Sequence, residues 1–176
     1  MLNFAYNMDK VQIINGLLPG LELLAEGSPE VQKATLNQFV PLFSYIQRNY
    51  PQDGYKKAAD TMMPILEKML YSQTQDIRDK AISIIADLRT VVQEPEKEMI
   101  MAVTLRMAQD ENEYNRESAV KLLNEIAPDM GQEICEYFIV PTFKSLGLDT
   151  HTFVRITVVK NLLNISNNVS LEYFSN

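Results

Sequence analysis

One helical pattern occurs four times along the chain, and this repetition limits the possible fold more than any other feature. Equivalent positions fall at Val31, Ile77, Asn115 and Val154, so the copies are separated by 46, 38 and 39 residues. Spacings of this size are typical of repeats built from two helices. The sequence therefore predicts a chain of helical hairpins in which each hairpin packs on its neighbours.

Each copy places a similar stripe of residues along one side of its second helix. Offsets of 4, 8 and 11 from the first position fall on one face of an α-helix. The predicted core stripes are Val31, Thr35, Phe39 and Leu42; Ile77, Ala81, Ile85 and Leu88; Asn115, Ala119, Leu123 and Ile126; and Val154, Val158, Leu162 and Ile165. We therefore expect every second helix to turn an equivalent face to the core.

Prolines recur at one register of the first helices. Pro19, Pro64 and Pro141 each lie 12 or 13 residues before the start of the following second helix. An interior proline costs a helix about 3 kcal/mol, so three of them at one register predict a shared bend. Pro41 lies within a second helix, and it is expected to kink or shorten that helix near Asn37.

These patterns predict an all-α fold, a right-handed α-solenoid of about four helical hairpins. Short connections place consecutive helices antiparallel to one another. The return helix of the third hairpin is expected to end at Pro128–Gly131. The predicted repeats span residues 10–48, 54–93, 95–128 and 131–168, and they form one solenoid domain over residues 10–168.

The two ends of the chain are expected to be partial or terminal segments, at residues 1–9 and 169–176. Leu171, Tyr173 and Phe174 are apolar and begin a pattern that the sequence does not complete. Terminal repeats normally carry a polar cap. We therefore expect this chain to be a fragment of a longer array, or to pack its end on a partner.

The last two copies share a turn aspartate followed six residues later by an arginine, as Asp110 with Arg116 and Asp149 with Arg155. Together with the first-helix prolines and the Val-Arg start of the second helix, these residues resemble the HEAT repeat family over residues 10–168. In that family the aspartate and the arginine form a hydrogen-bonded ladder between successive repeats. The resemblance implies the same structural role for these four residues.

The earlier copies depart from this motif. Arg78 follows Ser72 instead of an aspartate, and the first copy has Glu26 and Gln32 at the two positions. The resemblance therefore implies an incomplete ladder in the first half of the chain. Because Arg78 lacks its usual aspartate, we expect its guanidinium to contact a protein partner.

Two segments narrow the resemblance within the family. Residues 17–24 (LLPGLELL) and 76–81 (DIRDKA) are most similar to the group that contains the protein phosphatase 2A scaffold subunit and the protein phosphatase 4 regulatory subunit. This implies a non-catalytic scaffold or regulatory subunit that assembles a serine/threonine phosphatase. The alternative is a solenoid of the transport-receptor or coat-adaptor type, which binds peptide signals.

Charge and composition exclude several other classes of partner. The 176 residues include 23 acidic and 16 basic side chains, for a net charge of −7, which disfavours nucleic acid as a partner. No apolar stretch approaches the roughly 20 residues that span a bilayer, so membrane insertion is not expected. The lone Cys135 and a start without a signal-peptide pattern favour a cytoplasmic location, with the nucleus as an alternative.

The sequence lacks the combinations of residues that catalysis or metal binding would require. His151 is the one histidine and Cys135 the one cysteine, so neither a zinc site nor a nucleophile with its base is expected. No glycine-rich phosphate loop occurs in the sequence. We therefore predict a protein that is not an enzyme and that carries no cofactor or metal.

The second helices also present a polar face. Positions two, six and ten beyond each helix start point away from the core, on the face that is concave in solenoids of this type. They place Asp79 and Asp87 in the second copy, and Glu117, Lys121 and Glu125 in the third. The hypothesis is that the four carboxylates form an acidic band that binds a basic or polar peptide.

Overall fold

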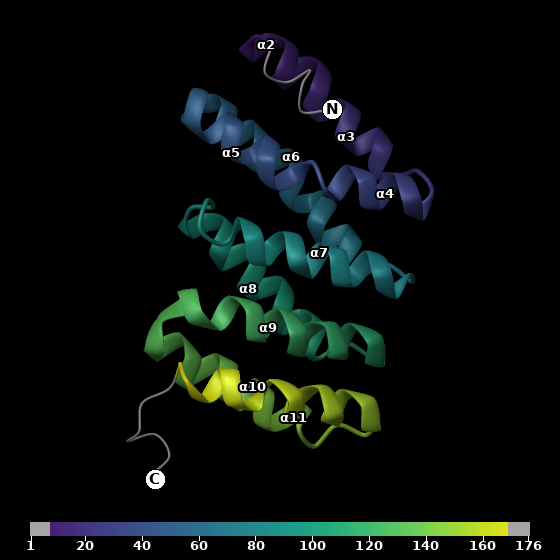
Figure 1. Ribbon diagram of the computed structural model, residues 1–176. Helices are drawn as coiled ribbons and strands as arrows, with labels where there is room; N and C mark the ends of the chain where they lie inside the picture. The colour runs from purple at the N-terminus through teal and green to yellow at the C-terminus, as the bar shows by residue number, and fades with distance from the viewer. Residues whose placement is uncertain (1–7, 169–176) are drawn as a thin grey trace. The chain divides into compact units, whose positions relative to one another are not determined.

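The computed structural model describes residues 8–168, which form two compact units. Unit 1 ends at Glu96 and unit 2 begins at Lys97. Every regular element between residues 8 and 168 is a helix, as predicted (Figure 1). Each unit contains two helical hairpins, so each can be understood as one hairpin packed on another.

The helices follow one another with short connections. Unit 1 contains α2 (Lys10–Gln12), the π-helical turn η1 (Ile13–Leu17), α3 (Leu18–Ala25), α4 (Pro29–Leu36), α5 (Phe39–Asn49), α6 (Asp53–Leu70) and α7 (Gln75–Leu88). Helix α8 (Glu94–Ala108) begins at the end of unit 1, and unit 2 continues with α9 (Glu113–Ile134), the π-helical turn η2 (Cys135–Ile139), α10 (Val140–Leu146) and α11 (Thr152–Ser166).

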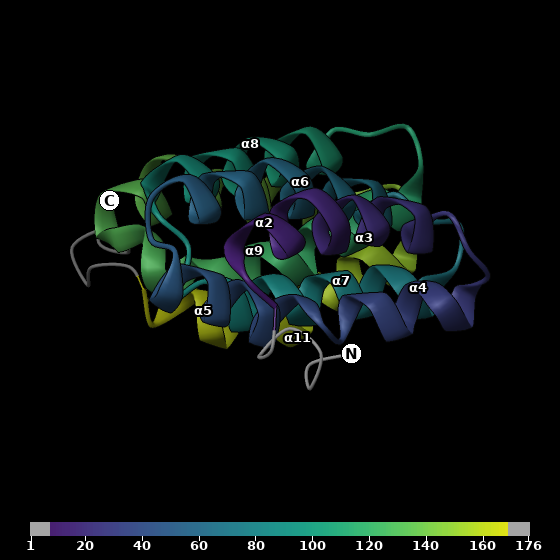
Figure 2. The same ribbon diagram turned by 90° about the horizontal axis from the view of Figure 1, so that it is seen from above.

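Unit 1 consists of two layers of helices. The first helices of its hairpins, α2–α3 and α6, lie side by side in one layer, and the second helices, α4–α5 and α7, lie in the other (Figure 2). Helix α3 packs against α6 and α4 packs against α7, so the second hairpin stacks on the first. This arrangement is the elementary step of a helical-repeat fold.

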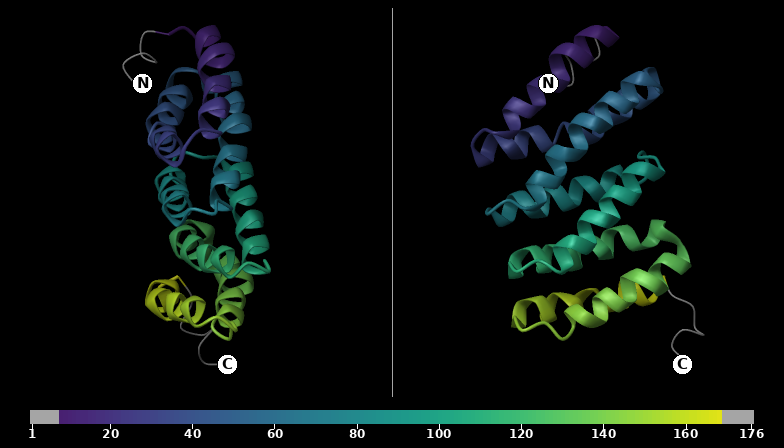
Figure 3. Two further views of the ribbon diagram at one scale, coloured as in Figure 1. Left: turned by 90° about the vertical axis from the view of Figure 1, so that its right-hand side faces the viewer. Right: turned by 180° about the vertical axis from the view of Figure 1, so that it is seen from behind.

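Unit 2 repeats this two-layer arrangement. Its first helices, α8 and α10, and its second helices, α9 and α11, lie on opposite sides when the molecule is viewed from the side (Figure 3). Helix α11 packs against both α9 and α10. Residues 169–176, where the apolar terminal pattern was noted, lie outside the described residues, as do residues 1–7.

The predicted core stripes are confirmed in the middle of the chain. Every member of the stripes on α7 and α9 is buried. Two predicted members at the ends of the chain are wrong, because Val31 on α4 and Leu162 on α11 are exposed. Val31 is the third residue of α4, and Leu162 is 54% exposed on α11.

The prolines of the first helices occur in two kinds of backbone. Pro19 and Pro141 each follow a π-helical turn, in which the residue before the proline donates its N–H to a carbonyl five residues earlier, Leu18 to Ile13 and Val140 to Cys135. The wider turn accommodates a ring that would otherwise clash with the carbonyl four residues earlier. At Pro64, by contrast, α6 continues without such a turn.

The second helices are interrupted at two of the places that the sequence indicated. The interruption expected near Asn37 is confirmed, since α4 ends at Leu36 and α5 begins at Phe39. The expected end of the third return helix at Pro128–Gly131 is confirmed, because the backbone stays helical past Pro128 and leaves the helical conformation at Gly131, at φ 75°. A left-handed backbone of this kind favours glycine, and it turns the chain toward η2.

None of the helices within residues 8–168 is long and apolar enough to cross a membrane.

Burial of the second-helix stripe predicts a large difference between two leucines of unit 2. Leu123→Ala removes a side chain that is fully buried on α9, and it should lower the free energy of unfolding by about 2–5 kcal/mol. Leu163→Ala on α11 is the matched control, because Leu163 is exposed, and it should change stability by about 0.5 kcal/mol or less. Urea denaturation followed by circular dichroism measures both. Equal losses would contradict the packing described for unit 2.

Candidate functional site

Three arginines at the start of the second helices bind the turn that precedes them. The Nη1 atoms of Arg78, Arg116 and Arg155 each donate to the carbonyl oxygens of the residues six and five positions earlier. These six distances lie between 2.7 and 3.2 Å. The guanidinium fork therefore satisfies carbonyls that follow the end of the first helix.

The first residue of each turn supplies a matching acceptor. Ser72 Oγ, Asp110 Oδ1 and Asp149 Oδ1 each accept the N–H of the residue two positions later, at 2.8–3.2 Å. Serine and aspartate both form turns of this type. The serine at position 72 therefore keeps the local role of the aspartate, although it has no carboxylate to offer a second arginine.

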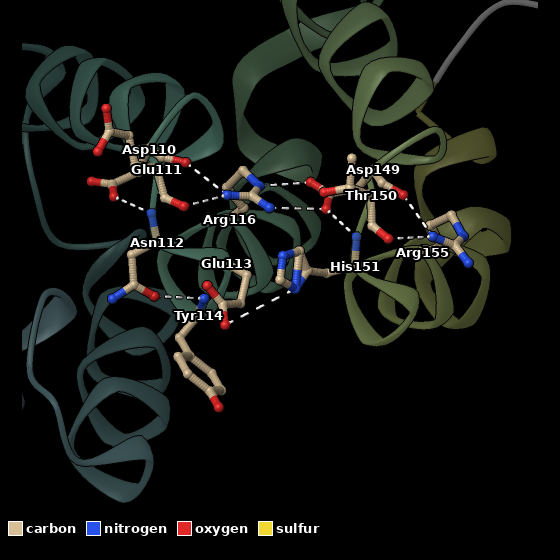
Figure 4. A network of polar contacts seen from close by, with 10 residues as sticks. All are labelled: Asp110, Glu111, Asn112, Glu113, Tyr114, Arg116, Asp149, Thr150, His151 and Arg155. Carbon is tan, nitrogen blue, oxygen red and sulfur yellow. Dashed lines mark hydrogen bonds and ion pairs between the residues drawn. The ribbon is translucent and has the colours of Figure 1, made fainter.

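Arg116 and Asp149 connect the two hairpins of unit 2 (Figure 4). Arg116 Nε donates to Asp149 Oδ2 at 2.6 Å, and Arg116 Nη2 donates to Asp149 Oδ1 at 3.0 Å. The two side chains are 13% and 6% exposed. A paired fork of this kind is stronger and more directional than a single neutral hydrogen bond.

This pair joins the turns of the two successive hairpins of unit 2, and the ladder role that the resemblance implies for it stays a prediction. The hydrogen bond from Arg116 holds the pKa of Asp149 below its ordinary value. Arg155, at the equivalent position of the last hairpin, directs its Nη2 to Thr152 Oγ1 at 3.0 Å. Arg155 therefore binds the backbone carbonyl of Asp149, which lies six residues earlier. The carboxylate of Asp149 binds Arg116 of the preceding hairpin instead.

The structure does not present Arg78 as the exposed, partner-facing residue that the sequence suggested. Its side chain is buried, with the residue 4% exposed, and it donates to the carbonyls of Ser72 and Gln73. These bonds need no aspartate side chain at position 72. The expectation of a partner contact overlooked them, because backbone carbonyls are not visible in a residue-type motif.

The polar face of α7 carries the two carboxylates expected in unit 1. Asp87 is exposed and Asp79 is half-buried, with Gln75 Nε2 at 3.5 Å from Asp79 Oδ2. Ser83 is exposed between them. All three lie on the second-helix layer, on the side away from the buried stripe.

The corresponding face of α9 in unit 2 is more strongly interconnected. Lys121 Nζ lies 3.2 Å from Glu117 Oε1, and Thr157 Oγ1 of α11 lies 3.5 Å from the same oxygen. Glu125 Oε1 accepts from Asn124 Nδ2 at 3.3 Å. Lys121 therefore offsets part of the negative charge expected on this face, and the charge of Glu125 lies one turn beyond that ion pair.

Asparagines extend the polar face of unit 2 from one helix to the next. Asn164 Nδ2 of α11 donates to Asn124 Oδ1 of α9 at 2.9 Å. Sequence reasoning missed this contact, because the two residues occupy different registers in their repeats. An amide pair offers both donors and acceptors to a peptide backbone.

An exposed aromatic group lies at the turns of unit 2 and was also missed. The rings of Tyr114 and Phe153 stack with centroids 5.5 Å apart, and His151 meets Phe153 edge-on at 5.9 Å. Tyr114 and His151 are exposed. His151 Nδ1 also lies 4.0 Å from Glu113 Oε1, next to the Arg116–Asp149 pair (Figure 4).

Cys135 is a buried core residue. Its Sγ donates to the carbonyl of Ala127 at 3.3 Å, and burial raises the pKa of its thiol. A raised pKa lowers the fraction of thiolate, which is the nucleophilic form. The cysteine therefore has a packing role in unit 2.

Removing the charge of Asp149 should destabilise the chain and change its response to acid. Asp149→Asn keeps the acceptor for the turn but loses the ion pair with Arg116, at an expected cost of about 1.5–3 kcal/mol near pH 7. The folded-state pKa of Asp149 lies below its ordinary value of 3.8. The stabilisation is therefore complete above that value and disappears as the pH falls through the folded-state pKa.

Denaturation of the wild type and of Asp149→Asn between pH 7 and pH 2 measures this effect. The difference between the two should close in acid. Asp76→Asn is the matched control, since Asp76 pairs with Lys33 at 2.5 Å on the exposed surface of unit 1, where water screens the charges. A large loss in the control, or a pH-independent loss for Asp149→Asn, would contradict the role assigned to the Arg116–Asp149 pair.

Comparison with known proteins supports the fold. No protein-family model matches the chain, and no curated protein sequence matches it. Among solved structures, the chain is similar to a designed armadillo repeat protein in complex with the peptide (KR)4, with 17% identity, a TM-score of 0.51, and coverage of 86% of this chain and 64% of that one. An engineered protein matches with 18% identity, a TM-score of 0.49, and coverage of 90% and 63%.

The chain thus spans less than two thirds of the length of either structure. At this level of identity the first likeness shows the fold alone. It confirms the predicted fold class, an all-α solenoid of helical repeats. It does not extend to the group of phosphatase scaffold and regulatory subunits, so that narrower resemblance remains a proposal.

Proposed function

We propose that this protein is a non-catalytic scaffold that binds a basic peptide segment of another protein on the polar face of its second helices. The observation that carries the proposal is a repeated pair of carboxylates. Asp79 and Asp87 are eight residues apart on α7, and Glu117 and Glu125 have the same spacing on α9. The spacing places each pair about two helical turns apart along one side of its helix.

Electrostatics favour a cationic partner for these faces. The carboxylates are half-buried or exposed, where they attract Lys and Arg side chains at a distance that depends on salt concentration. The amide pair of Asn124 and Asn164 adds donors and acceptors beside Glu125. The similar designed armadillo repeat protein is in complex with the peptide (KR)4, which supports the same class of ligand here.

The turns offer a second contact of the same scaffold. The exposed Tyr114 stacks on the half-buried Phe153 beside the Arg116–Asp149 pair, and that pair holds the two turns of unit 2 at a fixed spacing. Aromatic side chains on a rigid support are common anchors in protein interfaces. A partner that spans the turns would therefore add apolar contacts to the charged ones.

The resemblance to HEAT-repeat scaffold subunits supports a finer proposal, that the bound protein is a serine/threonine phosphatase catalytic subunit. Affinity capture of the full chain, followed by quantification of stoichiometric partners, tests this directly. Recovery of a phosphatase catalytic subunit with the wild type, and its loss with Tyr114→Ala, supports the finer proposal. Capture of other partners only would contradict it and leave the peptide-binding proposal to its own test.

Neutralising the carboxylates tests the peptide-binding proposal. The fluorescently labelled peptide (KR)4 should bind the wild type, and the double variant Asp79→Asn with Asp87→Asn should raise its Kd about five- to tenfold, which corresponds to about 1–1.4 kcal/mol. Glu117→Gln with Glu125→Gln should have a similar effect in unit 2. Fluorescence anisotropy at low ionic strength measures each Kd, and added salt should weaken binding to the wild type most.

The matched control removes the same charge from the other layer. Glu22 on α3 and Asp60 on α6 are exposed in unit 1, on its first-helix layer. Glu22→Gln with Asp60→Asn should leave the Kd within about twofold. If the control weakens binding as much as the second-helix variants do, the attraction reflects net charge only and the proposed site is wrong.

A further inference from the structure

Helix α11 carries an apolar stripe that nothing within residues 8–168 covers. Val159 and Leu162 are 71% and 54% exposed, and Ile156 and Leu163 are also exposed. Ile156, Val159 and Leu163 are separated by three, four and seven residues, and Leu162 follows Val159 by three, so the four lie on one side of the helix. Side chains of this size are rarely grouped on a surface without a binding role.

Equivalent positions on the other second helices are buried. Val159 and Leu162 stand five and eight residues after the start of their repeat, where unit 1 has Leu36 and Phe39 and helix α9 has Val120. Those three side chains are at most 1% exposed. In each unit a further second helix packs on them, α7 in unit 1 and α11 in unit 2.

The stripe borders an open groove between α10 and α11. The groove has a volume of about 250 Å³ and is lined by Val140, Phe143, Lys144, Gly147, Val158, Leu162, Ile165 and Ser166. Pockets for drug-sized ligands usually measure about 300–1,000 Å³ and include several directed polar groups. A small, almost wholly apolar groove beside an apolar stripe suits the side chains of a helix better than a small molecule.

The charge of this surface differs from that of the rest of the chain. The chain as a whole is strongly acidic, but α10 and α11 contain no aspartate or glutamate. Their cationic residues include Lys144 at the groove and Lys160 beside the stripe, both exposed. An apolar helix flanked by carboxylates would match both the shape and the charge of this surface.

We propose that the α10–α11 surface, formed by the groove and the stripe of Ile156, Val159, Leu162 and Leu163, binds an amphipathic helix with acidic flanks from a partner protein. The partner helix lies along α11 as α11 itself lies along α9, and it inserts apolar side chains between α10 and α11. The proposal does not rest on the carboxylates of α7 and α9, so failure here leaves the peptide-binding proposal standing.

A pair of designed helical peptides tests the proposal. Both carry leucines at positions i, i+3, i+4 and i+7, and they differ in having glutamates or lysines along the flanks of the apolar stripe. The glutamate peptide should bind the full chain at least tenfold more tightly than the lysine peptide at low ionic strength. Fluorescence anisotropy gives both dissociation constants, and the (KR)4 peptide should not compete.

Substitutions locate the site. Leu162→Asp should raise the Kd of the glutamate peptide at least tenfold, because it places a charge at the rim of the apolar groove. Lys160→Glu should reduce the ratio of the two Kd values, lysine peptide to glutamate peptide, at least fivefold. The Kd of the lysine peptide itself should not rise. Leu23→Asp is the control, since it places the same charge at an exposed leucine of α3 in unit 1 (77% exposed, against 54% for Leu162), and it should leave both constants unchanged.

Two results would overturn the proposal. One is equal binding of the two peptides, or binding that Leu162→Asp does not weaken although circular dichroism shows a folded chain. The other is concentration-dependent self-association, measured by sedimentation velocity, that Leu162→Asp abolishes while neither peptide competes with it. In that case the occupant is a second copy of this chain.

Discussion

The structure depends on one constraint, which is that a single helical hairpin of this chain cannot bury its apolar stripe by itself. Val120 of α9 is buried on a helix against which α11 packs, and in unit 1 Leu36 and Phe39 are buried on helices against which α7 packs. Burial therefore belongs to pairs of successive hairpins. The same constraint explains why α11, which has no following hairpin within the described residues, leaves Val159 and Leu162 in contact with solvent.

Hydrophobic burial alone would allow the hairpins to slide, and the polar turns limit that freedom. Arg116 binds the carbonyls of its own turn and, through Asp149, the turn of the next hairpin. Because the guanidinium is planar and its donors are fixed, this contact has a narrow geometry. In unit 1, exposed pairs such as Lys33 with Asp76 connect successive hairpins, and such pairs contribute less because water screens them.

Some features of the fold follow from the type of residue at a given position of the repeat, and the sequence predicted these. The stripes of α7 and α9 and the break near Asn37 are of this kind. The motif paired Asp110 with Arg116 and Asp149 with Arg155, and it did not show that Arg116 binds the carboxylate of Asp149. The environment of Arg78 was not predictable in this way, because its acceptors are backbone carbonyls. The exposure of Leu162 was not predictable either, since it depends on what packs on the helix and not on the helix itself. The π-helical turns before Pro19 and Pro141 required knowledge of backbone hydrogen bonds that residue types do not specify.

Charge divides the candidate binding surfaces into two classes, and each of the two proposals assigns one class to a different kind of partner. The faces of α7 and α9 carry carboxylates and polar amides, so a basic, extended segment gains contacts there while an acidic one is repelled. The surface of α10 and α11 has lysines and an apolar groove without any carboxylate on its helices, so the preference is reversed. A ligand of one class is therefore a poor ligand of the other.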